Sequence, residues 1–222
     1  ATSKNGIIWS SCSPDFGADG VIDRFAQIKP KVLITCEYYL YNGKKINILE
    51  KIPKILKKIK SIKKIIVFPY KNNLENKLNT KYLNFYSILK GSKLDENFKK
   101  FNFNHPLYIL YSSGTTGIPK CITHGAGNVL IEHKKEFSLH CNIVNNDKIF
   151  YYTTTGWMMW NWLVGGLSVG ASLYLYDGSP TFPTKDNLIK LCSKEKINLF
   201  GVSAKYIDFL KKENLYFKKI DL

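Results

Sequence analysis

Short runs of β-branched and aromatic residues alternate along the chain with longer stretches of helical periodicity. The runs predict strands at residues 7–10, 32–35, 65–69, 107–112, 148–153, 172–176 and 199–202. Between residues 46 and 59, Ile and Leu recur every three or four positions with Lys between them, which predicts an amphipathic helix. Further helices are expected at residues 129–139, 188–194 and 204–212. Strands that alternate with helices indicate an α/β fold with mainly parallel sheets and flanking helices.

The segment from residue 70 to residue 104 follows neither period. It is rich in Lys, Asn, Leu and Phe. This composition predicts a solvated surface connector that leads into the next strand. Contact between its basic side and an anionic partner is the alternative interpretation.

The net charge of +16 does not by itself indicate a nucleic-acid-binding protein. All but one of the 33 basic residues are lysines, Arg24 being the exception. Proteins that contact phosphates and bases usually use the planar guanidinium group of Arg, which makes bidentate contacts. The lysines are spread among Asn and Ile, so they are interpreted as solvated faces, and no nucleic-acid partner is expected.

Length and cysteine content narrow the class of protein. The 222 residues suffice for one large domain or two small ones, and 45% hydrophobic residues argue against wholesale disorder. The five cysteines contain no CxxC pair and match no zinc spacing, so we expect a reducing, cytoplasmic location and no metal site. No apolar run reaches the roughly 18 residues of a membrane span. The N-terminal residues resemble neither a signal peptide nor a transit peptide.

The most specific feature is a buried strand that runs directly into a loop of hydroxyls and glycines. Residues 107–111 (LYILY) are followed by residues 112–120 (SSGTTGIPK). The glycines let backbone N–H groups turn toward an anion, and the Ser and Thr hydroxyls add donors. Lys120 adds a charge that can neutralise phosphate oxygens. The expected phosphate-binding residues are Ser112, Ser113, Gly114, Thr115, Thr116, Gly117 and Lys120. The spacing differs from that of a Walker A loop.

This string resembles the phosphate loop of the adenylate-forming enzymes, which include acyl-CoA synthetases, luciferases and the adenylation domains of peptide synthetases. Within this family, further strings are similar to acetoacetyl-CoA synthetases. They are SSCSPDFG at 10–17, VIDRFAQI at 21–28, HPL at 105–107, GWMMWNW at 156–162 and YDGSP at 176–180. The similarity covers essentially the whole chain.

The resemblance implies that residues 1–222 are part of the large N-terminal AMP-binding domain of an acid-thiol ligase. Its substrates would be acetoacetate, ATP and CoA, with Mg²⁺ on the phosphates. Thr116 and Lys120 would stabilise the phosphates, and no residue is a certain catalytic group, because the substrate carboxylate itself attacks the α-phosphate. A synthetase for acetate or propionate, and a basic module that holds a nucleic-acid backbone, are the alternatives.

The resemblance also assigns residues to the acyl and CoA sites. Trp157 would close the acyl pocket as a flat, rigid wall, and the turn at Ser203 and Ala204 would border the same pocket. Trp160 and Trp162 are interpreted as core residues. The expected CoA contacts are Tyr41, Asn42, Gly43, Lys44, Met159 and Thr181. Tyr41, Lys44, Met159 and Thr181 depart from the residues of related acetyl-CoA synthetases, which implies altered packing around CoA.

Several strings of the family are not found in this sequence. They are the adenine-binding strings, the ribose Asp, the hinge and the mobile C-terminal domain with its Lys. We therefore expect an internal fragment of a longer synthetase, which holds part of the ATP and acyl sites and is inactive alone.

Overall fold

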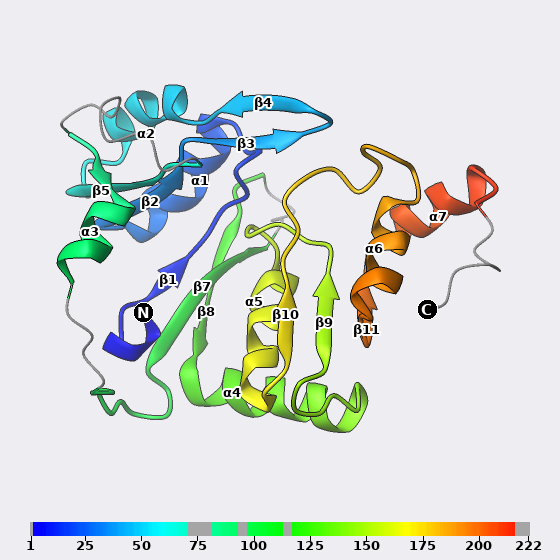
Figure 1. Ribbon diagram of the computed structural model, residues 1–222. Coiled ribbons are helices and arrows are strands. Elements are labelled where there is room, and N and C mark those ends of the chain that lie inside the picture. The colour runs from blue at the N-terminus through cyan, green and yellow to red at the C-terminus, as the bar shows by residue number, and fades with distance from the viewer. Residues whose placement is uncertain (1, 71–80, 93–96, 113–116, 216–222) are drawn as a thin grey trace. The chain divides into compact units, whose positions relative to one another are not determined.

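The computed structural model describes residues 2–70, 81–92, 97–112 and 117–215 (Figure 1). The chain divides into two compact units. Unit 1 takes its described residues from 1–39, 45–102 and 106–124, and unit 2 takes them from 40–44, 103–105 and 125–222. Each hydrophobic cluster falls within one unit, so we describe each unit by itself.

Unit 1 contains two small sheets. The first has the order β1-β7-β8, with β1 at Trp9–Ser10, β7 at Pro106–Ser112 and β8 at Lys120–Gly125. The second has the order β2-β5-β6, with β2 at Val32–Cys36, β5 at Lys64–Phe68 and β6 at Leu83–Asn84. The pairs β1–β7, β2–β5 and β5–β6 are parallel, as the alternating pattern predicts.

Two helices cover one face of the second sheet. They are α1 at Ala18–Ile28 and α2 at Ile52–Lys58, which follows a 3₁₀ turn at Leu49–Lys51. Buried side chains from both helices and from β2 form one cluster: Phe25, Leu33, Ile55 and Ile59. Because side chains alternate along a strand, Ile65 and Val67 of β5 face α2, whereas Phe68 stacks on Phe85 at a ring-centroid distance of 3.8 Å.

The predicted helix at 46–59 begins later than its apolar period indicates. Ile46 lies in β4 at Lys44–Asn47, which follows β3 at Tyr38–Tyr41. The Asn47 side chain accepts a hydrogen bond from the Leu49 N–H at 2.9 Å, which fixes the start of the 3₁₀ turn. A proline at the start of α2 then favours helix from that point onward.

The solvated connector predicted at 70–104 contains two regular elements that the sequence did not predict. Residues 83–84 form β6, and α3 follows at Phe85–Gly91. Asn84 starts this helix, because its side chain accepts from the N–H groups of Tyr86 and Ser87. The apolar residues Tyr86, Ile88 and Leu89 are 39%, 39% and 50% exposed, so no single buried stripe marks the helix in the sequence.

Unit 2 is built on a three-stranded parallel sheet of order β10-β9-β11. The strands are β9 at Lys148–Tyr151, β10 at Ser172–Tyr174 and β11 at Leu199–Gly201. Its helices are α4 at Ala126–Lys135, a π-helical continuation at Glu136–His140, α5 at Met158–Gly165, a 3₁₀ turn at Gly166–Val169, α6 at Asn187–Glu195 and α7 at Ala204–Lys212. The sequence predicted the bounds of α7 correctly and those of α6 to within one residue.

The central strand β9 is buried on both faces. Ile149 packs with Phe137 and Leu163 in one cluster, and Phe150 packs with Leu188 and Tyr206 in another. Ile149 is 0% and Phe150 is 1% exposed. Strands of a parallel sheet that is covered on both faces have this continuous apolar character.

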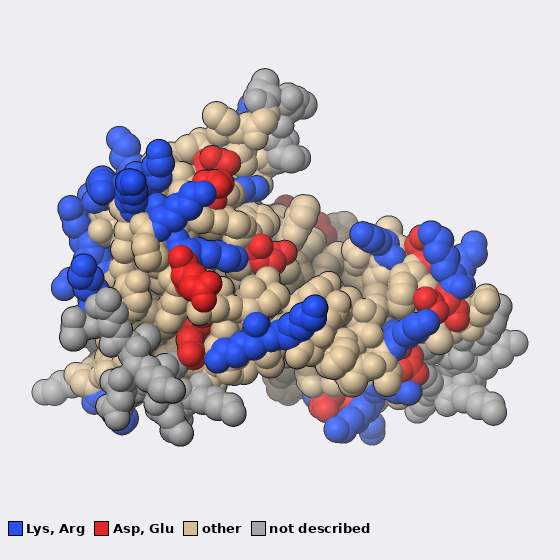
Figure 2. All heavy atoms as spheres, turned by 90° about the horizontal axis from the view of Figure 1, so that it is seen from above, with Lys and Arg blue, Asp and Glu red and all other residues tan. Residues whose placement is uncertain are grey.

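The lysines are placed at the surface, as the sequence indicates. Figure 2 shows Lys and Arg side chains with Asp and Glu between them on the face that it presents. The exposed lysines of α2 and the turn after it are Lys54, Lys57, Lys58, Lys60, Lys63 and Lys64. Lys54 pairs with Asp19 at 2.6 Å, and both side chains are more than half exposed. Such pairs contribute little to stability.

Candidate functional site

The predicted phosphate loop connects two neighbouring strands of one sheet. Ser112 ends β7, and Lys120 begins β8 beside it in the order β1-β7-β8. The connection is too short for the crossover that parallel neighbours need, so these strands run antiparallel and their loop ends lie together. Ser113, Gly114, Thr115 and Thr116 lie outside the described residues.

Gly117 and Lys120 have the properties that an anion site requires. Gly117 has φ +94°, which L side chains rarely adopt, and among the described residues nothing lies within 4 Å of where its Cβ would be. Lys120 is exposed. The C-terminal end of the loop therefore presents an open backbone position and an exposed cation, and an anionic ligand can approach both.

Helix α1 holds this end of the loop. Gln27 donates from Nε2 to the carbonyl oxygen of Pro119 at 2.9 Å, across 92 residues of sequence, and to the Asp23 carbonyl one turn earlier at 2.6 Å. Pro119 is buried. No local pattern in the sequence marks Gln27, although Gln27 belongs to the 21–28 string that carries the resemblance.

Arg24 of α1 lies against two aromatic rings, one of which, that of Tyr111, belongs to β7. Its guanidinium carbon is 4.5 Å from the ring centroid of Phe16 and 5.9 Å from that of Tyr111. Burial raises the pKa of Cys12 to about 12, although Arg24 opposes the shift, and burial also raises the pKa of Tyr111. Both groups are neutral at pH 7, so Arg24 is the charged member of this cluster and adds positive potential under β7. In the sequence, Arg24 stands out as the single arginine, and it belongs to the same 21–28 string as Gln27.

The resemblance assigns this loop to the phosphates of ATP. In the protein made from the complete reading frame, we therefore predict that Gln27→Ala raises the KM for ATP about two- to tenfold, because a hydrogen bond that fixes the loop is lost. The free energy of unfolding is expected to change by less than about 0.5 kcal/mol, since Gln27 is exposed. Steady-state kinetics at varied ATP checks the first value, and urea unfolding checks the second. Asp23→Ala is the control, since it keeps the carbonyl that Gln27 also contacts. A KM for ATP equal to that of wild type in Gln27→Ala would show that α1 does not hold the loop.

His124 is a titratable group in β8. Its ring centroid lies 5.1 Å from that of Tyr108 on β7, and burial lowers its pKa below the usual 6.5. Protonation therefore costs more in the folded state than in the unfolded state. The contribution of His124 to stability is complete above pH 6.5 and falls as the pH drops below that value.

The predicted consequence is that His124→Gln narrows the difference in unfolding free energy between about pH 7.5 and about pH 5.5. Urea unfolding at the two pH values checks this. The other histidines contribute equally to the pH dependence of the unfolding free energy in wild type and in His124→Gln. The difference between the two proteins therefore reports on His124 alone. An unchanged pH difference would contradict the assignment.

The residues that the resemblance assigns to the acyl pocket all lie in unit 2. Trp157 precedes α5 and is 67% exposed. Ser203 caps α7 by accepting a hydrogen bond from the Tyr206 N–H at 3.3 Å, and Ala204 is the first residue of that helix. Their role at the acyl group stays a prediction.

A cavity of about 240 Å³ in unit 2 is lined by other residues. These are Tyr151, Thr153, Trp160, Leu163, Tyr174, Leu175, Tyr176 and Asp177. Trp160 therefore borders open space, although the sequence was interpreted as placing it in the core. Trp162 packs on Phe137 at a centroid distance of 4.4 Å, in keeping with a core position.

Four of the residues expected to contact CoA form the tip of the β3–β4 hairpin. Tyr41 ends β3 and Lys44 begins β4, and both are exposed. Asn42 and Gly43 between them have φ values of 48° and 72°. This is the type I′ turn that Asn-Gly favours, a signal that the sequence analysis did not use.

The hairpin tip lies against the segment that contains Thr181. A Cβ placed on Gly43 would be 2.9 Å from Cζ of Phe182, the neighbour of Thr181. Thr181 itself donates from its N–H to Oγ of Ser179 at 3.4 Å. The structure thus brings the hairpin tip against Phe182, the neighbour of Thr181 in the chain. Met159 lies on α5 and is half-buried.

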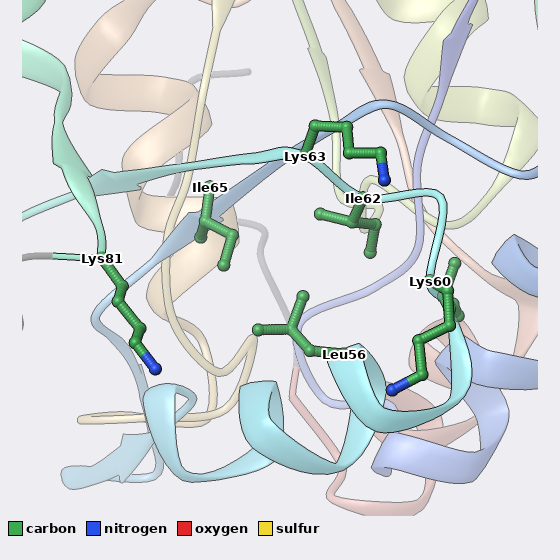
Figure 3. Close-up of a pocket in the computed structure, with 7 residues that line it drawn as sticks. Leu56, Lys60, Ile62, Lys63, Ile65 and Lys81 are labelled. Atoms are coloured by element: carbon green, nitrogen blue, oxygen red, sulfur yellow. The ribbon is translucent and has the colours of Figure 1, made fainter.

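Unit 1 has a larger cavity, of about 390 Å³, that none of the predicted site residues lines (Figure 3). Its apolar floor comes from α2, from the turn after it and from β5, and Lys60, Lys63 and Lys81 lie around it. The lysines belong to the basic surface of α2 and its neighbours. We therefore assign this cavity no part in the site at the phosphate loop.

In the part of the chain that the structure describes, no helix combines the length and apolar character that a bilayer crossing requires. No group of three or more His, Cys, Asp and Glu side chains is arranged to hold a metal ion among the same residues. None of the five cysteines, all of which lie in the described ranges, is in a disulfide.

Comparison with known proteins gives one consistent result. The family model described as "AMP-binding enzyme" matches residues 1–221. The chain is 48% identical to "Acetoacetyl-CoA synthetase" of Gallus gallus, over 97% of this chain and 33% of that protein. It is 46% identical to "Acetoacetyl-coenzyme A synthetase" of Rhizobium meliloti (strain 1021), over 96% of this chain and 33% of that protein.

A solved structure agrees with the sequence relatives. The structure titled "Acetoacetyl-CoA Synthetase from Streptomyces lividans" superposes with a TM-score of 0.89 at 39% identity, and the match covers 96% of this chain and 32% of that one. The chain therefore spans about a third of the length of the relatives it matches, and its α/β fold is that of the corresponding region.

Proposed function

This chain belongs to the AMP-binding enzyme family, and from that premise we propose that it forms part of an acetoacetate–CoA ligase. The whole reaction would convert acetoacetate, ATP and CoA into acetoacetyl-CoA, AMP and pyrophosphate. Because the relatives are about three times as long as the chain, we assign to it only part of that machinery. We propose that residues 1–222 supply part of the AMP-binding domain and form no acyl-adenylate alone.

The chemistry proceeds in two half-reactions. A carboxylate oxygen of the acid attacks the α-phosphorus of ATP, the bond from this phosphorus to the β-phosphate bridging oxygen breaks, and pyrophosphate leaves. The sulfur of CoA then loses its proton and attacks the acyl carbon, and AMP leaves with the bonding electrons. Neither step needs a nucleophile from the protein, so the residues of the chain act by positioning the substrates and neutralising charge.

The β7–β8 hairpin is the observation that carries the proposal. It places the open Gly117 and the cation of Lys120 beside the end of β7, and Gln27 holds the loop at Pro119. Charge-assisted hydrogen bonds from such a loop suit the β- and γ-phosphates of ATP. Ser112 lies at the same hairpin end, and Ser113, Gly114, Thr115 and Thr116 are assigned to the phosphates by the sequence.

Roles for the remaining assigned residues follow the same proposal. Trp157, with Ser203 and Ala204, would border the acyl group, and the exposed Trp157 indole would limit its length. Tyr41, Asn42, Gly43, Lys44, Met159 and Thr181 would contact CoA. The closeness of Gly43 to Phe182 supports a joint role for the hairpin tip and the Thr181 segment.

The proposal includes Mg²⁺ as the counter-ion of ATP. The described residues offer it no cluster of three or more acidic, His or Cys side chains, so we derive no step from protein ligands to the metal. We propose that the reaction takes place in the cytoplasm, as the cysteine pattern of the sequence favours a reducing compartment.

The test uses the protein made from the complete reading frame that contains this chain. We expect acetoacetate-dependent exchange of labelled pyrophosphate into ATP, followed by acetoacetyl-CoA when CoA is added. A panel of acetate, propionate and acetoacetate under the same conditions ranks kcat/KM for the acids. Preference for acetate or propionate would overturn the substrate assignment. Absence of exchange with every acid would overturn the proposed reaction class.

A further inference from the structure

The segment between β10 and α6 is held by side chains at both of its ends. The Asn187 amide donates from Nδ2 to the hydroxyl oxygen of Tyr176 at 2.8 Å and lies 3.5 Å from the carbonyl oxygen of Phe182. Tyr176 in turn donates to the carbonyl oxygen of Ser179 at 3.1 Å. Since Tyr176 follows β10 and Asn187 begins α6, one pair of side chains closes the whole segment.

Further hydrogen bonds hold the interior of the segment. Tyr152 donates to the carbonyl oxygen of Gly178 at 2.9 Å, and Ser179, which is 2% exposed, has its Oγ 3.3 Å from Oγ1 of Thr181. Burial raises the pKa of Tyr176, and the nearby charge of Asp177 raises it further. The Tyr176 hydroxyl therefore keeps its proton at neutral pH and can donate to Ser179 while it accepts from Asn187.

The Asn187–Tyr176 pair fixes the position of the Phe182 ring. Phe182 is 46% exposed, so its ring is not held by a core. Its backbone carbonyl is within reach of both Tyr176 and Asn187, at 3.4 Å and 3.5 Å. The ring lies against the backbone of Gly43, where an added Cβ would be 2.9 to 3.5 Å from three of its carbons. Movement of Phe182 would thus change the distance between the hairpin tip and Thr181.

We propose that Tyr176 and Asn187 are positioning residues for the CoA-dependent half-reaction, because they hold Phe182 against the hairpin turn at Gly43. This inference rests on the proposed function, since it takes the hairpin tip and Thr181 as the surface that receives CoA. Neither side chain needs to touch CoA. Their effect is on the shape of that surface, and the phosphate loop lies in the other unit.

The test compares Tyr176→Phe and Asn187→Ala with wild type, in the protein from the complete reading frame. Tyr176→Phe removes one hydroxyl and keeps the ring, which packs near Phe150 at 6.2 Å. We expect each variant to raise the KM for CoA about tenfold, as the loss of a hydrogen bond in a coupled pair predicts. Acetoacetate-dependent pyrophosphate exchange should stay within about twofold of wild type. The double variant should show no greater rise than the larger single one, because the two residues act through one contact.

Tyr206→Phe is the matched control. Tyr206 is buried in the cluster that contains Phe150, and its hydroxyl has no hydrogen-bond partner among the described residues. Its replacement should leave the KM for CoA and the exchange rate unchanged. Thermal unfolding is measured for every variant. If Tyr176→Phe does not fold, Asn187→Ala tests the same contact.

Each outcome has a defined meaning. A KM for CoA within twofold of wild type in both single variants overturns the inference, as does an equal loss in both half-reactions. If the wild-type protein forms no thioester with any acid, the proposed function fails instead. The contact is then tested by calorimetric titration with CoA alone, where unchanged affinity in the variants, or no binding by wild type, overturns it.

Discussion

Replacement of Lys120 by alanine, in the protein from the complete reading frame, is expected to raise the KM for ATP in pyrophosphate exchange about 10- to 100-fold. A hydrogen bond to a charged group contributes roughly 1.5–3 kcal/mol, and the proposed role of Lys120, which begins β8 and is exposed, is to donate such a bond to ATP. The unfolding free energy should change by less than about 0.5 kcal/mol, because the side chain is exposed.

Lys57→Ala provides the comparison for this variant. Lys57 is an exposed lysine on α2, outside the hairpin, so its removal lowers the net charge equally without touching the loop. If Lys57→Ala and Lys120→Ala raise the KM for ATP to the same degree, general charge accounts for ATP attraction and the specific role of Lys120 is wrong.

Replacement of Phe137 by alanine is expected to lower the free energy of unfolding by about 3–5 kcal/mol. Phe137 is 0% exposed and packs with Ile149 and Leu163 in the core of unit 2. Removal of the ring costs its transfer free energy and leaves a cavity that the surrounding helices fill only in part. Urea unfolding followed by circular dichroism measures the change.

Leu139→Ala is the control for this experiment. Leu139 lies two residues later in the same π-helical turn at Glu136–His140 but is 75% exposed. Its replacement should change the unfolding free energy by less than about 0.5 kcal/mol. Similar losses for the two variants would mean that the turn itself, rather than the burial of Phe137, determines stability.

The sequence predicted elements whose signals are local. Helix α7 is bounded by Ser203, a favourable N-cap, and its amphipathic period is regular, so its bounds are correct. The predicted strand at 107–112 matches β7, since a long apolar run before glycines is a clear signal. The class of fold was identified for the same reason. The assignment of residues 112–120 to a phosphate loop stays a prediction.

Other elements depend on contacts that no local pattern contains. Helix α1 has Gly20 within it, which weakens its helical signal, and the helix is held by packing on α2. The bond from Gln27 to Pro119 joins residues 92 positions apart. The contact of Gly43 with Phe182 is likewise long-range, although the Asn-Gly turn that makes it possible was readable in the sequence.

The two-sided burial of β9 has a consequence for how unit 2 comes apart. Ile149 and Phe150 are adjacent in the chain yet anchor different clusters, one with α5 and the other with α6 and α7. If the packing of either cluster is lost, β9 is no longer held in place for the other cluster. A shift of β9 by one residue along its neighbours would exchange Ile149 and Phe150 between the clusters. The helices on the two faces of the sheet are therefore coupled through the backbone of β9. We expect unit 2 to unfold in one cooperative transition, rather than one face before the other.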